Sequence, residues 1–346
     1  MLHFLYTPYT FTKGSYGRYE DANAEIVKHG ARVLGGLGPV HVSSFHAGRI
    51  TDRPDDALLG HPTWGPPDLA ADWMRDNALE EDAAGHPNAY VIMPWVPRFP
   101  PEWHMPFIER QLRAARRIFG LCGAHWAEET RVLDDGSLQA EVSDKLVAVN
   151  MGCTAALLPF REGRCVSARP TLLHVSHLGS YKRFDRLLAS IHGLDVRLCI
   201  ATRSLPRGLL NLDAQGVGRV QIHCLGVIDN GDPGFNRFVL DEVDFYIHTS
   251  DLDAQATAVL EAAARGVVPM VTPESGFRSP FAIHLCEDPA RNREIIARAL
   301  AMPEAEYRER ARGLRRQILE EHGWEHVFGT IWRTIAADLA SVRAAA

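Results

Sequence analysis

One stretch, residues 244–262, restricts the possible folds of this chain more than any other part of the sequence. It opens with a segment at residues 244–249, with an apolar centre, that is typical of a buried strand, passes through an acidic loop, and ends in a helix that begins near Thr257. Backbone N–H groups at the start of such a helix can bind a diphosphate, while carboxylates beside it accept hydrogen bonds from sugar hydroxyls. A strand, loop and helix in this order are therefore suited to a sugar nucleotide.

The rest of the second half repeats this alternation of apolar strands and helices. Strands are expected at residues 171–175, 196–200, 220–225 and 267–271, with a helix at residues 183–192. Near-continuous apolar strands separated by helices are typical of a parallel sheet that is covered on both faces. The first half shows a similar order, with a short opening strand, a helix that ends near Arg32 and a strand at residues 40–45. The sequence therefore predicts an α/β fold.

The length of 346 residues is about twice that of a typical domain, so two domains are expected. The boundaries are predicted from the linker-like residues 161–164: a first domain at 1–163, a second at 164–320, and a C-terminal helix at 321–346 that packs back on the first domain. A net charge of -6 argues against a nucleic-acid partner.

The location of the protein is predicted from its cysteines and its apolar segments. The six cysteines are scattered without a Cys-x-x-Cys pair, which favours reduced thiols. The N-terminus lacks the pattern of a signal peptide, and no apolar run approaches ~18 residues. A cytoplasmic protein is therefore expected.

A basic amphipathic helix is predicted at residues 106–119. Its apolar residues recur at helical spacing, and four arginines lie between them: Arg110, Arg113, Arg116 and Arg117. An ordinary surface helix with a solvated basic face explains this pattern. The alternative is contact with anionic lipid, which would place the protein peripherally on the inner face of a membrane.

Asp253 and Glu261 are separated by seven residues, and Glu261 stands in a Leu-Glu-Ala context. This pattern resembles the second domain of retaining, GT-B-fold glycosyltransferases, in particular glycosyltransferase family four, and the resemblance covers roughly residues 140–275. It implies that Glu261 accepts hydrogen bonds from the nucleotide ribose and that Asp253 accepts them from the hydroxyls of the transferred sugar. The family usually has Glu at the first position, so the shorter Asp253 is a departure.

Lys182 follows a Gly-containing loop and precedes a helix, in a chain with only four lysines. A point charge at this place can stabilise a departing diphosphate. The resemblance implies that Lys182 is the phosphate-binding lysine, although a solvent-exposed lysine is the alternative. Five residues earlier, where the family usually has Arg, His177 is either a second phosphate contact or a structural loop histidine.

Backbone groups complete the predicted donor site. The amides of Gln255, Ala256 and Thr257 are expected to bind phosphate, although Thr257 can also simply cap its helix. The resemblance implies that the base is held through backbone groups near Val227.

The first half resembles the family only loosely. Gly14 and Ser15 occupy the place of its N-terminal Gly-rich loop, and an ordinary tight turn is the alternative explanation. The loop lacks the spacing of a dinucleotide fingerprint, which disfavours a nicotinamide dehydrogenase. His61 stands in a loop where family members often have a His that contacts the sugar, and a structural hydrogen bond is the alternative role.

Two sequence patterns resemble metal-binding motifs, but their context favours other roles. Residues 251–253 spell the Asp-x-Asp of metal-dependent GT-A enzymes, but their position just before the Leu-Glu-Ala segment favours the metal-independent GT-B interpretation. His322 and His326 have the spacing of a helical metal pair without an evident third ligand.

The resemblance thus implies a GT-B fold, with two Rossmann-like domains facing across a cleft. The activity it implies is retaining transfer of a sugar from a nucleoside-diphosphate sugar to a glycan, lipid-linked or small-molecule acceptor, without a metal or other cofactor. Two alternatives stay open. One is a GT-B-fold enzyme of another reaction, such as a sugar-nucleotide epimerase or a phosphorylase, and the other is a non-catalytic glycan-binding or partner subunit.

Overall fold

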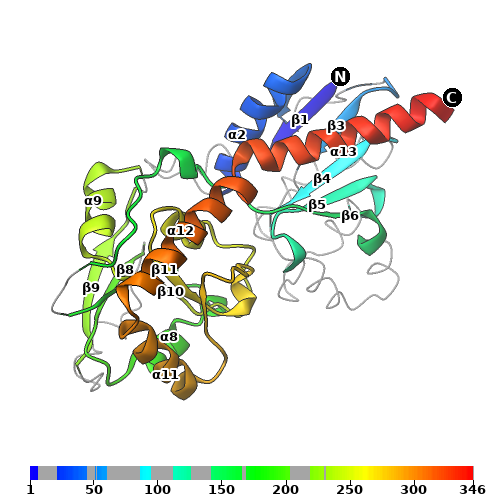
Figure 1. The fold of residues 1–346 in the computed structure, drawn as a ribbon. Helices are drawn as coiled ribbons and strands as arrows, with labels where there is room; N and C mark the ends of the chain where they lie inside the picture. Colours follow the sequence, from blue (N-terminus) through cyan, green and yellow to red (C-terminus); the bar gives the residue numbers. More distant parts are fainter. Residues whose placement is uncertain are drawn as a thin grey trace. The chain divides into compact units, whose positions relative to one another are not determined.

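Two six-stranded parallel sheets form the framework of the chain, each in its own unit (Figure 1). The computed structural model describes residues 1–6, 22–44, 51, 53–60, 86–94, 112–125, 142–165, 169–202, 219–229 and 231–345. The first unit comprises Met1–Gly152 together with Trp324–Ala346, and the second comprises Cys153–Gly323. In the described part of the chain, no helix combines the length and the apolar character needed to cross a bilayer.

The second unit contains a sheet with the strand order β12-β11-β10-β7-β8-β9. Its strands are β7 (Thr171–Val175), β8 (Arg197–Ala201), β9 (Gln221–Gly226), β10 (Phe245–His248), β11 (Val268–Val271) and β12 (Ile283–His284). Its helices are α8 (Phe184–Ile191), α9 (Pro233–Glu242), α10 (Thr257–Ala264), α11 (Pro289–Leu300) and α12 (Glu304–Glu321). The strands predicted from apolar runs match β7 to β11 closely.

The central strands β10 and β11 are buried at every residue, because helices cover both faces of a parallel sheet and favour apolar side chains there. The strand order reverses at β7: β8 and β9 follow on one side, while β10, β11 and β12 lie on the other. In open parallel sheets, ligands bind beyond the carboxyl ends of the strands at such a switch point. A ligand site is therefore expected in the loops that follow β7 and β10.

The first unit contains a parallel sheet with the order β2-β1-β3-β4-β5-β6. Its strands are β1 (Leu2–Tyr6), β2 (Val40–Ser44), β3 (Ala57–Gly60), β4 (Ala89–Met93), β5 (Arg117–Gly120) and β6 (Leu146–Ala148). Helix α13 (Trp324–Ala345) packs on α2 (Ala22–Leu37) in this unit (Figure 1). Gly30 allows the close approach, since a Cβ there would lie 2.5 Å from the ring of Phe328.

The division of the chain differs from the expected boundaries, because residues 161–164 pack inside the second unit. The N–H of Arg161 donates to the carbonyl of Arg265 at 3.1 Å, and its guanidinium binds the carbonyls of Leu240 and Val243. Gly266 has a φ of 82°, and a Cβ there would lie 1.9 Å from the carbonyl oxygen of Arg161. The segment expected to be a linker is therefore part of a packed corner at the end of α10.

The prediction of a basic helix at residues 106–119 is wrong over its last residues, because Arg117–Gly120 form strand β5. Ile118 and Phe119 are fully buried there, and a short apolar pair of this kind fits a strand as well as a helix. Arg116 and Arg117 pair with Asp338 of α13, at 3.5 and 3.1 Å. These two arginines thus hold the C-terminal helix instead of forming a solvated basic face. Residues 106–111 lie outside the described part of the chain.

Candidate functional site

The loops that follow β7 and β10 lie side by side at the switch point, because these two strands are neighbours in the sheet. Hydrogen bonds hold the loops together. The N–H of Asp251 donates to the carbonyl of Tyr181 at 2.8 Å, the hydroxyl of Ser250 donates to the same carbonyl at 3.1 Å, and the hydroxyl of Thr249 donates to the carbonyl of Arg183 at 2.9 Å. The two loops therefore form one connected surface beyond the strands.

Lys182 ends the 3-10 turn η4 (Ser180–Lys182) in the first of these loops and is buried, with 6% of its surface exposed. Its ammonium forms an ion pair with the carboxylate of Asp253 and lies 5.1 Å from the centroid of the Tyr181 ring. A buried ammonium is costly unless it is paired, so Asp253 is what makes this position of the lysine stable. Lys182 is thus not a solvent-exposed lysine, which removes the simplest alternative to a functional role.

The carboxylate of Asp253 accepts hydrogen bonds from three donors. Its Oδ2 accepts from Lys182 and from Nε2 of His248 at 2.9 Å, while its Oδ1 accepts from the N–H of Ala254 at 3.2 Å. Burial would raise the pKa of Asp253, but the charge of Lys182 and the hydrogen bond from His248 outweigh that effect and lower the pKa below its usual range. Asp253 therefore stays ionised and keeps its charge beside Lys182.

Two histidines that the sequence interpretation did not select lie behind this ion pair. His248 ends β10, His174 lies in β7, and their rings stack with 5.6 Å between the centroids. Nδ1 of His174 donates to the carbonyl of Ile247 at 2.9 Å, and its Nε2 accepts from the hydroxyl of Ser176 at 2.8 Å. Burial lowers the pKa of both rings, that of His174 to about 3, so both imidazoles are neutral near pH 7.

A second ion cluster lies next to the first. Asp251 pairs with Arg183 through Oδ2 and with Arg186 through Oδ1, each at 2.6 Å. The two carboxylates of the Asp-x-Asp tripeptide therefore face different cations, since Asp253 pairs with Lys182. Across the described residues, no group of three or more His, Cys, Asp or Glu side chains is placed to hold a metal ion.

The backbone of the two loops is strained. Among the described non-glycine residues, those with positive φ are Leu178 at 52°, Arg183 at 46° and Gln255 at 44°, and all three lie in these loops. Each such residue costs on the order of 1–3 kcal/mol, and such strain clusters at functional sites. Strained backbone at the switch point therefore indicates a functional site independently of any side chain.

Helix α10 begins directly after the second loop. Ala256 precedes it and provides no side-chain cap, although the first N–H groups of any helix lack acceptors within that helix. Ala256 and Thr257 thus stand where the amides of an anion site are expected, and Gln255 is buried just before them.

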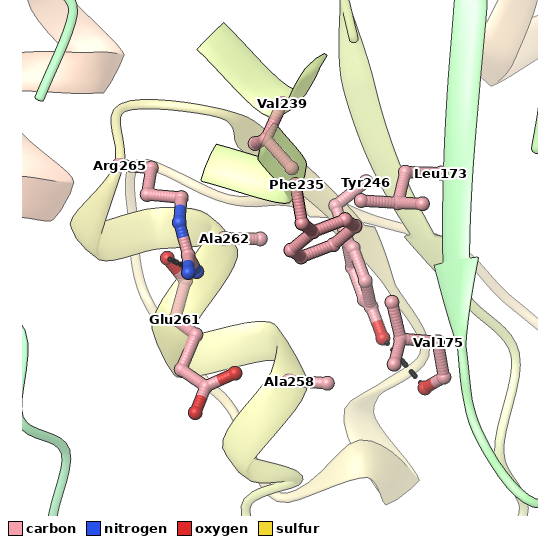
Figure 2. Close-up of a pocket in the computed structure, with 9 residues that line it drawn as sticks. All are labelled: Leu173, Val175, Phe235, Val239, Tyr246, Ala258, Glu261, Ala262 and Arg265. Carbon is pink, nitrogen blue, oxygen red and sulfur yellow. Dashed lines mark hydrogen bonds between the residues drawn. The ribbon is translucent and has the colours of Figure 1, made fainter. Parts of the chain in front are cut away.

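Glu261 lies one turn further along α10 and lines a small pocket (Figure 2). The other lining residues come from β7, α9, β10, α10 and the residue that follows α10: Leu173, Val175, Phe235, Val239, Tyr246, Ala258, Ala262 and Arg265. Figure 2 shows the carboxylate of Glu261 directed toward the turn that contains Ala258 and away from the ring of Phe235. The guanidinium of Arg265 donates to the backbone carbonyl of Glu261 at 3.2 Å and to the side-chain oxygen of Asn236 at 2.8 Å.

The remaining predicted residues are placed differently. His177 lies in the β7 loop, with its Nε2 2.8 Å from the hydroxyl of Tyr181. Val227 is 45% exposed and follows the edge strand β9, so β7 and β8 separate it from β10. Gly14, Ser15 and His61 lie outside the described residues. The structure thus brings Lys182 and Asp253 together and leaves Val227 apart from them.

The two buried histidines carried a weak signal in the sequence. Each interrupts an otherwise apolar strand, and a buried imidazole needs a hydrogen-bond partner. His248 stands five residues before Asp253, so its partner lies in the next loop. The sequence therefore offered one indication of a role for His248: a polar residue at the carboxyl end of a central parallel strand, close to an acidic loop.

Comparison with known proteins by sequence finds no matching family model and no matching curated protein. Solved structures do match. Sucrose-phosphate synthase from Thermosynechococcus elongatus aligns with a TM-score of 0.67 at 13% identity, over 97% of this chain and 99% of that one. WaaG, a glycosyltransferase involved in lipopolysaccharide biosynthesis, aligns over the same shares with a TM-score of 0.59 at 12% identity.

A third match is Anabaena HepE in complex with UDP and glucose, with a TM-score of 0.58 at 10% identity over 97% of this chain and 99% of that one. Some neighbours are longer, and this chain spans 55% of the length of TarM. At these identities the likeness defines the fold. The protein has the GT-B fold of glycosyltransferases, which confirms the predicted fold class.

Proposed function

We propose that the protein is a retaining glycosyltransferase of the hexosyltransferase type, which moves a sugar from a nucleoside-diphosphate sugar to a carbohydrate, lipid-linked or small-molecule acceptor. The observation that carries the proposal is the position of the Lys182 ammonium. It is buried, paired, and located at the switch point, beside the loop that leads into α10. This is the place at which parallel sheets of this kind bind ligands.

The residues of the switch point suit a departing diphosphate. Negative charge grows on the leaving group as the bond to the sugar breaks, and preorganised cations and amides stabilise it without reorganisation. Lys182 would supply the cation, and the amides near Ala256 and Thr257 would supply oriented donors. Glu261, which lines the neighbouring pocket, would accept hydrogen bonds from the ribose.

We propose that the reaction needs no metal ion or other cofactor. Asp251 and Asp253 are each paired with basic side chains. Together they therefore do not form the free pair of carboxylates that binds a divalent cation on a diphosphate. We also propose a cytoplasmic location. All six cysteines are unpaired, which fits a reducing compartment.

UDP is the first nucleotide to test, because the HepE neighbour was solved with UDP and glucose. Thermal unfolding would be followed with UDP, GDP, ADP and CMP, each with and without Mg²⁺. A ligand at ~100 times its Kd stabilises the folded protein by about 2.7 kcal/mol, which gives a visible shift in Tm. The variant is Lys182→Met, and the control is Lys28→Met, at a lysine of α2 whose side chain is 58% exposed.

The expected result is a metal-independent shift with one nucleoside diphosphate that is lost in Lys182→Met and kept in Lys28→Met. The matching nucleotide sugar should then be turned over with release of that nucleoside diphosphate. Binding without turnover, in the presence of candidate acceptors, would favour a non-catalytic glycan-binding or partner subunit. Epimerised sugar among the products would instead identify a sugar-nucleotide epimerase.

A further inference from the structure

We propose that His248 is a positioning residue that fixes the Lys182 ammonium through the Asp253 carboxylate. The proposal rests on the glycosyltransferase function above and changes the role of one residue in it. Asp253 holds the lysine in place instead of binding the transferred sugar.

The contacts of Asp253 support this role. One oxygen, Oδ2, accepts from both Lys182 and His248, while Oδ1 accepts from the N–H of the next residue, Ala254. The N–H of Asp253 donates to the carbonyl of Glu274 at 2.9 Å, which fixes the backbone as well. With 14% of its side chain exposed, the carboxylate is turned toward the protein and away from solvent. Its hydrogen bonds are directed at the lysine and the histidine.

The imidazole of His248 is itself held rigidly. It stacks on His174 at 5.6 Å and on Tyr246 at 6.2 Å, and the whole residue is buried. The carbonyl of His248 accepts from the N–H of Thr272 at 3.2 Å, at the end of the neighbouring strand. An ionised carboxylate only accepts hydrogen bonds, so the contact with Asp253 requires the proton of His248 on Nε2. The ring therefore offers a donor at one fixed point.

The other ring nitrogen of His248 explains why this bond matters. Nδ1 is buried and has no hydrogen-bond partner in the described part of the chain. An apolar residue of similar size would pack in the same space without leaving a buried acceptor unpaired, so packing alone does not account for a histidine here. The bond from Nε2 to Asp253 is the feature that only the histidine supplies.

Position matters for a lysine more than for most cations. The ammonium is a point charge on a flexible four-carbon chain, so its place must be imposed by its surroundings. A displacement of about 1 Å at a reacting centre can lower a rate by about 100-fold. Through Asp253, His248 would set this place before the donor binds. The shorter arm of aspartate keeps the carboxylate close to the backbone, where both partners reach it.

Steady-state turnover of the nucleotide sugar tests the proposal in the wild type and in His248→Phe, His248→Gln and Asp253→Glu. His248→Phe keeps an aromatic ring for the stack but loses the donor, and kcat is expected to fall by about 10- to 100-fold with little change in KM. His248→Gln restores an N–H donor at a similar distance and should recover part of kcat. Asp253→Glu should also lower kcat, because the longer arm moves the carboxylate away from its place.

The matched control is His3→Phe, at another buried histidine that contacts a carboxylate, Asp56, at 3.1 Å in the first unit. It should leave kcat unchanged. Wild-type kcat in His248→Phe would overturn the positioning role and leave the proposed function intact. Wild-type kcat in Asp253→Glu would also overturn the positioning role and leave the proposed function intact. If His248→Phe does not fold, the kcat of Asp253→Glu is the deciding measurement. A wild type that turns over no nucleotide sugar would overturn both proposals.

Discussion

His174 and His248 lie ring to ring in the core of the second unit, with 5.6 Å between centroids and 25° between ring planes. The second ring contacts Asp253, which in turn pairs with Lys182. Protonation of either ring would place a charge beside a neutral neighbour and close to a fixed ammonium. Both the stability and the geometry of the candidate site therefore depend on these rings staying neutral.

The first prediction concerns acid stability. Burial and the neighbouring His248 lower the pKa of His174 to about 3, whereas the unfolded chain should have a value of about 6.5. Between these pH values the unfolded state binds more protons, so stability is full above about pH 6.5 and falls as the pH decreases. The contribution of His174 to the free energy of unfolding should fall by up to about 1.4 kcal/mol for each pH unit. Urea unfolding between about pH 7.5 and 4.5 should show it, and His174→Asn should flatten it.

Asp253 contributes to the pH dependence of stability in a different pH range from His174. Its pKa is lowered in the folded state, so its contribution is present above the unfolded value of about 3.9 and is lost only below it. The window between about pH 6.5 and pH 4 therefore reports on the histidines. Parallel curves for the wild type and His174→Asn would contradict the neutral, buried imidazole.

The second prediction concerns the strained loop after β7. Leu178 has a φ of 52°, a conformation that costs roughly 1–2 kcal/mol for a residue with a Cβ. Leu178→Gly should therefore be more stable than Leu178→Ala by about 1 kcal/mol, although glycine is usually the poorer choice. At the exposed Ala297 in α11, Ala297→Gly should be less stable than the wild type by a similar amount. Urea unfolding gives the change in the free energy of unfolding from Ala to Gly at each position. A change of the same sign at both positions would disprove the strain at Leu178.

The third prediction concerns the packed corner at the end of α10. Gly266 and Gly193 both have positive φ, at 82° and 80°, but only Gly266 has a close neighbour, the carbonyl oxygen of Arg161. Gly193→Ala should cost about 1–2 kcal/mol from the backbone alone. Gly266→Ala should cost clearly more, because its Cβ would lie 1.9 Å from that oxygen and the segment must move. Equal losses in thermal unfolding would show that the segment at Arg161 does not pack there.

The sequence predicted the parallel sheet of the second unit well, because β7, β10 and β11 are central strands. A strand covered on both faces is mostly apolar, and that pattern is visible without a structure even where a histidine interrupts it, as in β7 and β10. The two-residue strand β12 gave no comparable run and was not predicted. Strand β5 was assigned to a helix because its buried residues follow directly on a segment with helical spacing.

Two residues selected from the sequence, Lys182 and Asp253, meet in the structure, but their contact was not predictable. The resemblance selected Lys182 and Asp253, yet nothing in their spacing of 71 residues showed that they form an ion pair. The supporting ring of His248 was missed because its role depends on the ion pair between Asp253 and Lys182, which comes from a different loop. Such contacts arise from the order of strands in the sheet, which spacing along the chain does not reveal.

The last prediction tests Glu261 as a ligand of the ribose. If its carboxylate accepts hydrogen bonds from the ribose hydroxyls, Glu261→Gln should weaken UDP binding by about 10-fold or more, since a hydrogen bond to a charged group contributes about 1.5–3 kcal/mol. The same variant should bind 2′,3′-dideoxy-UDP as tightly as the wild type does, because that nucleotide lacks both hydroxyls. Isothermal titration calorimetry gives the four dissociation constants of this cycle.

The control is Glu242→Gln, at the last residue of α9, where the carboxylate pairs with Arg197 at 3.0 Å away from the pocket. It should leave both nucleotides unaffected. An equal loss of affinity for both nucleotides in Glu261→Gln would show that the carboxylate acts on the helix or on Arg265 and not on the ribose. A loss confined to UDP would place the ribose beside α10, and with it the diphosphate near the start of that helix and Lys182.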